Sequence, residues 1–203
     1  MTEFLFSSAF TLWNTPTSWL ELIAVLLAFA MVYFNIRELH WGWPLAAISS
    51  GLYFFLFWEQ RLYGDACLQI FFAVVALWGW WVWLRGIQGV SISISTSSQQ
   101  QRVVFMGSGA VLWLVTGWFL LNFTDTDVPW WDAFPTAFSI VGQFLLARKK
   151  LDNWLIWVIV NIVSVALFAW KGLWLTTLLY LVFIALSVVG WRSWRARLSD
   201  ATS

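Results

Sequence analysis

One set of side chains in the second half of the chain has the types and spacing needed to bind a small molecule. Its members lie three or four residues apart, so they share one face of an α-helix: Trp154, Trp157, Asn161, Ser164 and Phe168. Tryptophan rings attract flat cationic groups by about 0.5–2 kcal/mol each, while neutral amides and hydroxyls exchange hydrogen bonds. The pattern is typical of a pocket for a planar, amphipathic solute such as a cationic heteroaromatic ring.

Further polar side chains interrupt other apolar segments, where an unbonded polar group is costly. Together with the first set they give the side chains that we expect to bind substrate: Trp157, Asn161, Gln143, Gln69, Tyr53, Ser50, Tyr180 and Ser164. The alternative is that each amide only bonds to a neighbouring helix, for about 0.6–2 kcal/mol. Most other tryptophans fall at segment ends, where they are expected to anchor the chain at a membrane interface.

Composition indicates that lipid surrounds most of the chain. Of its 203 residues, 61% are hydrophobic and only 10% are charged, whereas a soluble domain carries about 25% charged residues. The net charge of +1 and the lack of a basic stripe exclude a nucleic-acid-binding protein. Cys67 is the only cysteine, so neither an intrachain disulfide nor a cysteine metal site is expected. No cofactor and no metal are expected.

Seven apolar segments are long enough to cross about 30 Å of hydrocarbon as helices: 17–36, 44–60, 64–84, 103–123, 130–147, 153–170 and 173–193. Basic residues predict their orientation. With seven spans, one side holds Arg37, Arg85, Arg102, Arg148, Lys149, Lys150, Arg192, Arg195 and Arg197, and the other only Arg61 and Lys171. We therefore expect an external N-terminus and a cytoplasmic C-terminus.

The chain also resembles itself. A shift of 111 residues, the separation of Trp43 and Trp154, also superimposes Trp83 on Trp194 and Gly79-Trp80 on Gly190-Trp191. This register predicts an all-α membrane domain with a 3+1+3 arrangement: a first triplet at 18–85, a linker with its helix at 86–129, and a second triplet at 130–195. Because three spans plus one is an even number, the triplets are parallel repeats, which place a binding site between the halves near the midplane.

Two polar segments are expected on the cytoplasmic side. The stretch from Ser91 to Gln101 is rich in serine and glutamine and is interpreted as a flexible linker. His40, the only histidine, is expected to be solvated beside Arg37 and Glu38. No Asp, Glu, Lys, Arg or His lies in the middle third of a span, so the proton relay of a coupled pump is not expected. Sodium coupling is less firmly excluded.

Several of these motifs resemble one known family, the PnuC vitamin transporters. They are Leu62-Tyr63, Leu68-Gln69 with Phe71-Phe72, Gly79-Trp80 with Trp83, Trp131-Asp132, Ala147-Arg148-Lys149, Asn153-Trp154 and the run from Trp157 to Ser164. The resemblance implies a SWEET-like fold, a homo-oligomer that is expected to be a trimer, and a bacterial inner membrane. It also implies that Trp157 and Asn161 contact substrate and that Gln69 matches a family glutamine. Ser49-Ser50 stand where some members have asparagine.

The function that the resemblance implies is import of nicotinamide riboside by facilitated diffusion, after which a cytoplasmic kinase phosphorylates and traps it. Thiamine is the alternative vitamin. An enzyme acting on lipids is a second class of function, but the chain has no DxxxD or HxxxH pair. A structural membrane subunit is a third, although it would not need the polar face. We therefore predict a transporter and not an enzyme.

Overall fold

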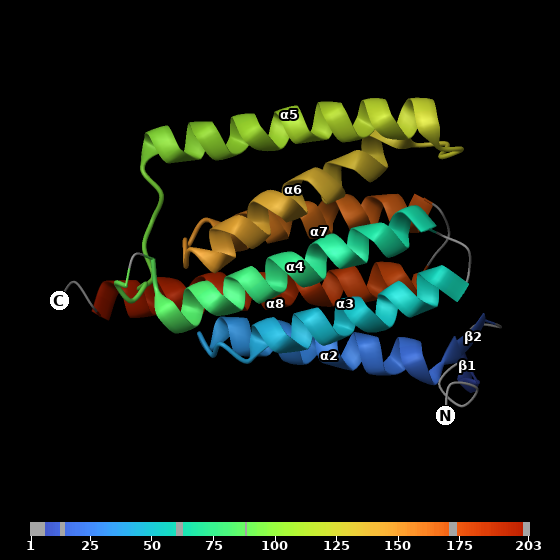
Figure 1. Ribbon diagram of the computed structural model, residues 1–203, viewed down its shortest axis with the longest axis horizontal. Helices are drawn as coiled ribbons and strands as arrows, with labels where there is room; N and C mark the ends of the chain where they lie inside the picture. Colours follow the sequence, from blue (N-terminus) through green and yellow to red (C-terminus); the bar gives the residue numbers. More distant parts are fainter. Residues whose placement is uncertain (1–6, 13–14, 60–62, 88, 171–173, 201–203) are drawn as a thin grey trace. The chain divides into compact units, whose positions relative to one another are not determined.

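The computed structural model describes residues 7–12, 15–59, 63–87, 89–170 and 174–200. The described residues form seven helices and one hairpin (Figure 1): β1 (Ser8–Leu12), β2 (Thr15–Ser18), α2 (Trp19–Ile36), α3 (Gly42–Glu59), α4 (Tyr63–Arg85), α5 (Gln99–Phe123), α6 (Pro129–Ala147), α7 (Asn153–Trp170) and α8 (Trp174–Asp200). The chain divides into two compact units, one ending at Val90 and one beginning at Ser91.

Each of the seven predicted spans is a helix, but two helices extend beyond the predicted ends by four residues or more. Helix α5 begins at Gln99 because Ser98 caps it: the serine hydroxyl accepts from the Gln101 N–H, and the glutamine side chain accepts from the Ser98 N–H. Helix α8 continues to Asp200 through its arginines. The antiparallel β1–β2 hairpin was not predicted. Arg61 and Lys171, used to predict the orientation, lie outside the described residues.

The outward helix faces are apolar. Within the described residues, three helices are long and apolar enough to cross a membrane, namely Gln99–Phe123, Asn153–Trp170 and Thr177–Asp200, and two shorter apolar helices cover Val25–Ile36 and Gln69–Arg85. Large side chains such as Leu114, Trp118 and Phe119 of α5 are exposed. Exposed apolar surface of this extent is covered by lipid or by other proteins.

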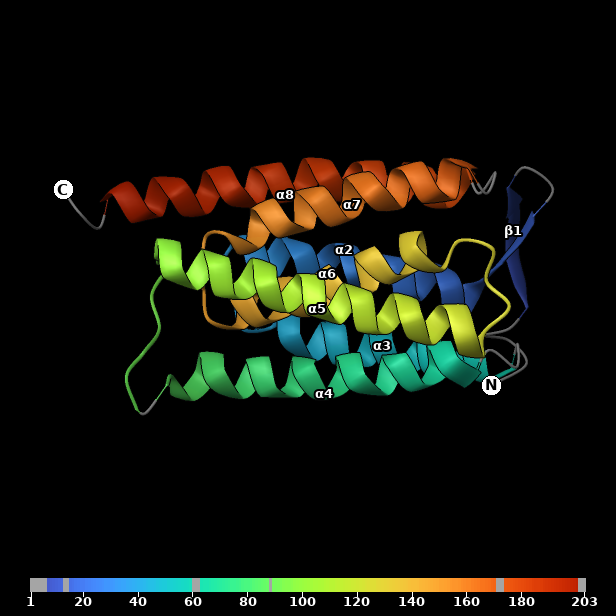
Figure 2. The same ribbon diagram turned by 90° about the horizontal axis from the view of Figure 1, so that it is seen from above.

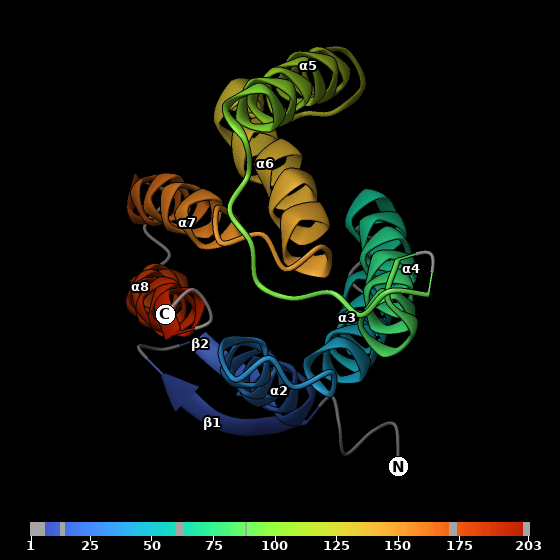
Figure 3. The ribbon, with the colours of Figure 1, turned by 90° about the vertical axis from the view of Figure 1, so that its left-hand side faces the viewer.

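In the first unit, α3 contacts both α2 and α4 (Figure 3). The contact between α3 and α4 is built on Trp43, which is buried. Its ring lies directly on Gly79, where an added Cβ would come within 2.4 Å of ring carbon Cζ3. The edge of Trp83 meets the same indole, with ring centroids 5.7 Å apart. Glycine is required at position 79 because any side chain would displace the tryptophan.

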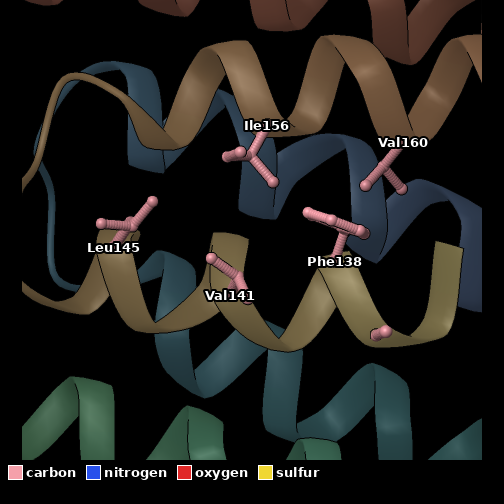
Figure 4. Close-up of a cluster of buried hydrophobic side chains, with 6 residues drawn as sticks. Phe138, Val141, Leu145, Ile156 and Val160 are labelled. Carbon is pink, nitrogen blue, oxygen red and sulfur yellow. The ribbon is translucent and has the colours of Figure 1, made fainter. Parts of the chain in front are cut away.

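In the second unit, α6 lies between α5 and α7 (Figure 3), and α7 packs along α8 (Figure 2). Trp154 of α7 lies on Gly190 of α8, where an added Cβ would be 2.6 Å from the ring, and its centroid is 5.4 Å from that of Trp194. An apolar cluster joins α6 to α7 (Figure 4): Ala137, Phe138, Val141, Leu145, Ile156 and Val160. Aromatic and aliphatic packing therefore fixes α7 from two sides.

The turns α2–α3 and α6–α7 have the same backbone conformation. Glu38 and Lys149, which are 111 residues apart, have φ values of 57° and 49°, and no other described non-glycine residue has a positive φ. The next N–H in each turn bonds back five residues: Leu39 to Phe34 at 2.8 Å, and Lys150 to Leu145 at 2.9 Å. Each helix thus ends in a Schellman motif.

The linker before α5 is held against the α6–α7 turn, so the expectation of a flexible linker is wrong for residues 95–101. Ser95 pairs with this turn through its N–H to the Lys149 carbonyl at 3.1 Å and its carbonyl to the Leu151 N–H at 2.9 Å. The Ser97 N–H donates to the Asp152 carboxylate at 2.8 Å, and Arg102 forms an ion pair with it at 2.8 Å. A composition rich in serine and glutamine predicts a flexible segment only where the backbone forms no bonds with the rest of the chain.

Asp152 is the electrostatic centre of this docked segment. Partial burial raises the pKa of its carboxyl, but hydrogen bonds from Ser97 and the charge of Arg102 lower the pKa by more. The pKa is therefore below its ordinary value, and the ionised form is favoured.

His40 is also not simply solvated. Its Nδ1 accepts a hydrogen bond of 3.2 Å from the indole N–H of Trp80. This bond ties the α2–α3 turn to α4.

Candidate functional site

Helix α7 carries the most polar and aromatic face of the second unit. Asn161 and Ser164 are buried, and Trp157 is partly buried. At about 100° per residue, Trp154 and Asn161 lie at one edge of this face, and Trp157 and Ser164 lie at the other, roughly 60° round the helix. The two edges contact different neighbouring helices.

The Asn161 edge contacts α8. The amide nitrogen of Asn161 donates a long hydrogen bond of 3.4 Å to the hydroxyl of Ser187. Ser187 in turn donates to the Phe183 carbonyl at 2.7 Å. Both residues are only 4% exposed. A buried amide in an apolar bundle thus bonds to a neighbouring helix.

The Trp157 edge contacts α6. Its indole lies against Gly142, where an added Cβ would be 3.1 Å from ring carbon Cε2 and 3.3 Å from Nε1. The next residue, Gln143, has its carbonyl oxygen Oε1 buried, with no hydrogen-bond partner among the described residues. A buried acceptor without a partner is rare in proteins. Gln143 thus keeps one acceptor available for a ligand or a water.

Tyr180 contacts the end of the α7 face nearest the α7–α8 connection. Its ring lies 5.2 Å from that of Phe168, at an interplanar angle of 31°, and 6.0 Å from that of Phe183 in an edge-on arrangement. The structure therefore brings Tyr180 to the predicted α7 face, as an aromatic neighbour of Phe168.

The remaining predicted site residues belong to the first unit. Ser50 and Tyr53 lie on α3, with Ser50 buried and Tyr53 partly buried. Gln69 lies on α4 and is partly buried. Ser50 is the counterpart of Asn161 under the 111-residue shift, and Gln69 is the counterpart of Tyr180.

Sequence reasoning missed Ser187 as part of the site. The available signal was its position seven residues after Tyr180, which places the two on one side of α8. Serine in a membrane helix is common and often bonds to its own backbone, so the signal was weak. Within the described residues, no group of three or more His, Cys, Asp or Glu side chains could hold a metal ion.

Apolar helices, a charge-free polar face and aromatic packing define a multi-pass helical membrane protein. The family of nicotinamide mononucleotide transporters matches residues 18–196, and the chain belongs to this family. The resemblance predicted from sequence is thereby confirmed, and the chain is a member of a family of membrane transporters.

Two curated relatives illustrate the range of the family. The nicotinamide riboside transporter PnuC of Escherichia coli (strain K12) is 25% identical over 203 residues, covering 87% of this chain and 85% of that protein. The riboflavin/roseoflavin transporter RibM of Streptomyces davaonensis is 28% identical over 199 residues, covering 94% and 91%.

A solved structure has the same fold. The crystal structure of the vitamin B3 transporter PnuC matches with a TM-score of 0.72 and 21% sequence identity, covering 90% of this chain and 83% of that one.

Proposed function

We propose that the chain imports nicotinamide riboside across the bacterial inner membrane. The observation that carries this proposal is the buried Asn161 amide on the same helix face as Trp157. A pyridinium riboside offers a flat cation for the indole and hydroxyl and amide groups for hydrogen bonds. The E. coli relative named as a nicotinamide riboside transporter supports the choice of solute.

Transport in this proposal is facilitated diffusion. It is supported by the sequence, which places no Asp, Glu, Lys, Arg or His in the middle third of a span, whereas a proton relay needs such groups at depth. Net uptake then needs a sink, and phosphorylation of the solute by a cytoplasmic kinase provides one, because the added charge prevents escape.

The proposed architecture is the 3+1+3 parallel repeat, with triplets at 18–85 and 130–195 joined through 86–129. Support comes from the recurrence of the same contacts 111 residues apart: the two Schellman turns, Trp43 on Gly79, and Trp154 on Gly190. The excess of basic residues on one side supports an external N-terminus and a cytoplasmic C-terminus.

Self-association as a trimer is also proposed. The exposed apolar face of α5, which includes Val111, Leu114 and Val115, supports a contact with lipid or with another copy. Native mass spectrometry of the protein in mild detergent would distinguish a trimer from a monomer.

Riboflavin is a second candidate solute. The observation that favours it is the Streptomyces relative, which is named as a riboflavin/roseoflavin transporter and is 28% identical to this chain. The isoalloxazine ring of riboflavin is also flat and rich in hydrogen-bonding groups, so the same face of α7 suits it. Thiamine, another cationic heteroaromatic vitamin, remains the alternative predicted from sequence.

The test is uptake of labelled nicotinamide riboside, riboflavin and thiamine into proteoliposomes. We expect uptake of the riboside by the wild-type protein, and a clear reduction for Trp157→Ala and Asn161→Ala at unchanged expression. Ser108→Ala, on the exposed side of α5, serves as the control. Unchanged uptake in both site variants would refute the assignment of Trp157 and Asn161 to the site. Uptake of riboflavin or thiamine without uptake of nicotinamide riboside would refute the proposed solute. A protonophore should leave initial uptake unchanged; a drop would indicate coupling.

A further inference from the structure

We infer that Ser187 on α8 sets the orientation of the Asn161 amide, so that the amide oxygen is presented to the solute as an acceptor. Ser187 is then a positioning residue that selects solutes with a hydrogen-bond donor at this point, such as a hydroxyl or an amide N–H. The inference rests on the proposed function, because it assumes that Asn161 meets the solute.

The direction of the two hydrogen bonds carries the argument. A serine hydroxyl has one proton and two lone pairs. The Ser187 proton is used on the Phe183 carbonyl at 2.7 Å. Only lone pairs therefore face Asn161, and the amide group that meets them must be the NH₂ donor. This is the pair that the structure contains, with Nδ2 3.4 Å from the hydroxyl oxygen.

Reversing the amide would break this arrangement. A flipped Asn161 would place its oxygen against the lone pairs of Ser187, unless the serine gave up its bond to Phe183. Both side chains are 4% exposed, so water does not easily replace a lost bond there. Burial therefore makes the orientation selective. Ser187 takes one of the two Nδ2 protons, and Oδ1 is the acceptor left for a solute donor.

The first unit lacks this arrangement. The counterpart of Asn161 is Ser50, and the counterpart of Ser187 is Ala76, which is buried and has no hydroxyl. A hydroxyl at position 50 can act as donor or acceptor, whereas the oriented amide presents an acceptor. Selection by an oriented amide is therefore assigned to the second unit.

The experiment compares Ser187→Thr with Ser187→Val in the full chain in proteoliposomes. The two side chains have the same shape and differ only in the hydroxyl. Ser187→Ala adds no bulk and covers the case in which both larger residues impair folding. Ser108→Ala is the matched control, because Ser108 also donates to its own helix, at 2.9 Å to the Phe105 carbonyl. Uptake of nicotinamide riboside is competed by analogues that each lack one uncharged donor group: the 3-acetylpyridine riboside, which lacks the amide NH₂, and the single deoxyribosides, which each lack one hydroxyl.

We expect one analogue to compete about two- to tenfold more weakly than nicotinamide riboside itself, which is the range that one hydrogen bond supplies. This difference should be found in the wild type, in Ser187→Thr and in Ser108→Ala. In Ser187→Val and Ser187→Ala this difference should fall below about twofold, since the amide can then present either end. The inference would be overturned if all variants discriminated equally between the analogue and nicotinamide riboside. It would also be overturned if Ser187→Thr lost this discrimination together with Ser187→Val and Ser187→Ala.

A measurement without solute separates the two proposals. In ¹⁵N-asparagine-labelled protein, the Asn161 amide signals are those missing from Asn161→Ala. They should stay in place in Ser187→Thr and move to positions of an unbonded amide in Ser187→Val. If they do so while wild type takes up no riboside, the proposed function fails and the orientation by Ser187 stands. If they are the same in both variants, the orientation fails whatever is transported.

Discussion

The two helical triplets have the same framework but different polar groups. In both, a tryptophan of the second helix lies on a glycine of the third: Trp43 on Gly79, and Trp154 on Gly190. Yet Asn161 and Ser187 of the second triplet correspond to Ser50 and Ala76 of the first. Contacts that hold helices together are retained in both triplets, while side chains that could meet a solute differ. The packing contacts therefore recur where the residues of the proposed site do not.

The α2–α3 and α6–α7 turns also share a backbone conformation but differ in the groups that they contact. Both end a helix in a Schellman motif. The first is tied to its own unit by the bond from Trp80 to His40. The second has Leu151 at the position of His40, and the backbone of Leu151 pairs with Ser95 of the linker. One turn shape is thus stabilised by two different partners.

The largest effect is expected when Asn161 and Ser50 are each replaced by alanine, in two separate variants. Asn161→Ala should lower kcat/KM for riboside uptake by about tenfold or more, since it removes an oriented amide. Ser50→Ala should lower it by less than about threefold, because a lone hydroxyl is more easily replaced by another group or a water. Initial rates in proteoliposomes measure both. Equal losses would show that the two triplets contribute alike.

Next come the glycines beneath the tryptophans. Gly79→Ala and Gly190→Ala should each cost about 1–3 kcal/mol of stability, since the added Cβ forces a buried ring to move. Thermal unfolding in detergent would show lower midpoints for both. Gly51→Ala is the control, because a Cβ there meets nothing within 4 Å, and helix propensity predicts a gain of about 0.5–1 kcal/mol. A loss at only one of the two sites would mean that the frameworks are not equivalent.

A smaller effect is expected at the docked linker, which only the second unit has. Asp152→Asn should cost about 1 kcal/mol or less, because Arg102 is exposed and screened by solvent. The folded-state pKa of Asp152 lies below its unfolded value. Its contribution is therefore complete above the unfolded pKa, about 4, and is lost as the pH falls through the folded pKa.

Stability curves of wild type and Asp152→Asn should differ at neutral pH and converge in acid. Hydrogen exchange at the Ser97 amide, which bonds to this carboxylate, should be faster in the variant. Asp125→Asn, on an exposed residue, is the control and should leave both measurements unchanged. A gap that does not narrow as the pH falls through the folded-state pKa of Asp152 would contradict the role of the charge.

The smallest effect concerns the two turn residues with positive φ. Glu38→Gly and Lys149→Gly should each stabilise the protein by about 0.5–1 kcal/mol, because glycine adopts this conformation without a steric cost. Glu38→Ala and Lys149→Ala keep the strain and should give no gain. Thermal midpoints of the four variants test this, and a gain in only one turn would separate the two turns energetically.

The seven helices could be predicted from the sequence because their signal is local. An apolar run of sufficient length must form a helix in lipid, where backbone groups have no other partners. The repeat register stays a prediction, based on tryptophan, glycine and arginine residues that recur at one fixed separation. The family followed from the same residues. The hairpin was missed because two short strands carry little periodic signal.

Only the tertiary structure decided which partner each polar group meets. The sequence placed Asn161 and Trp157 on one helix face but could not direct the first toward Ser187 of α8 and the second toward Gly142 of α6. It also predicted a free linker where Ser95 and Ser97 bond to the α6–α7 turn. Helix periodicity is set by neighbours three or four residues away, whereas these contacts depend on how helices pack, which residues far apart in the chain determine together.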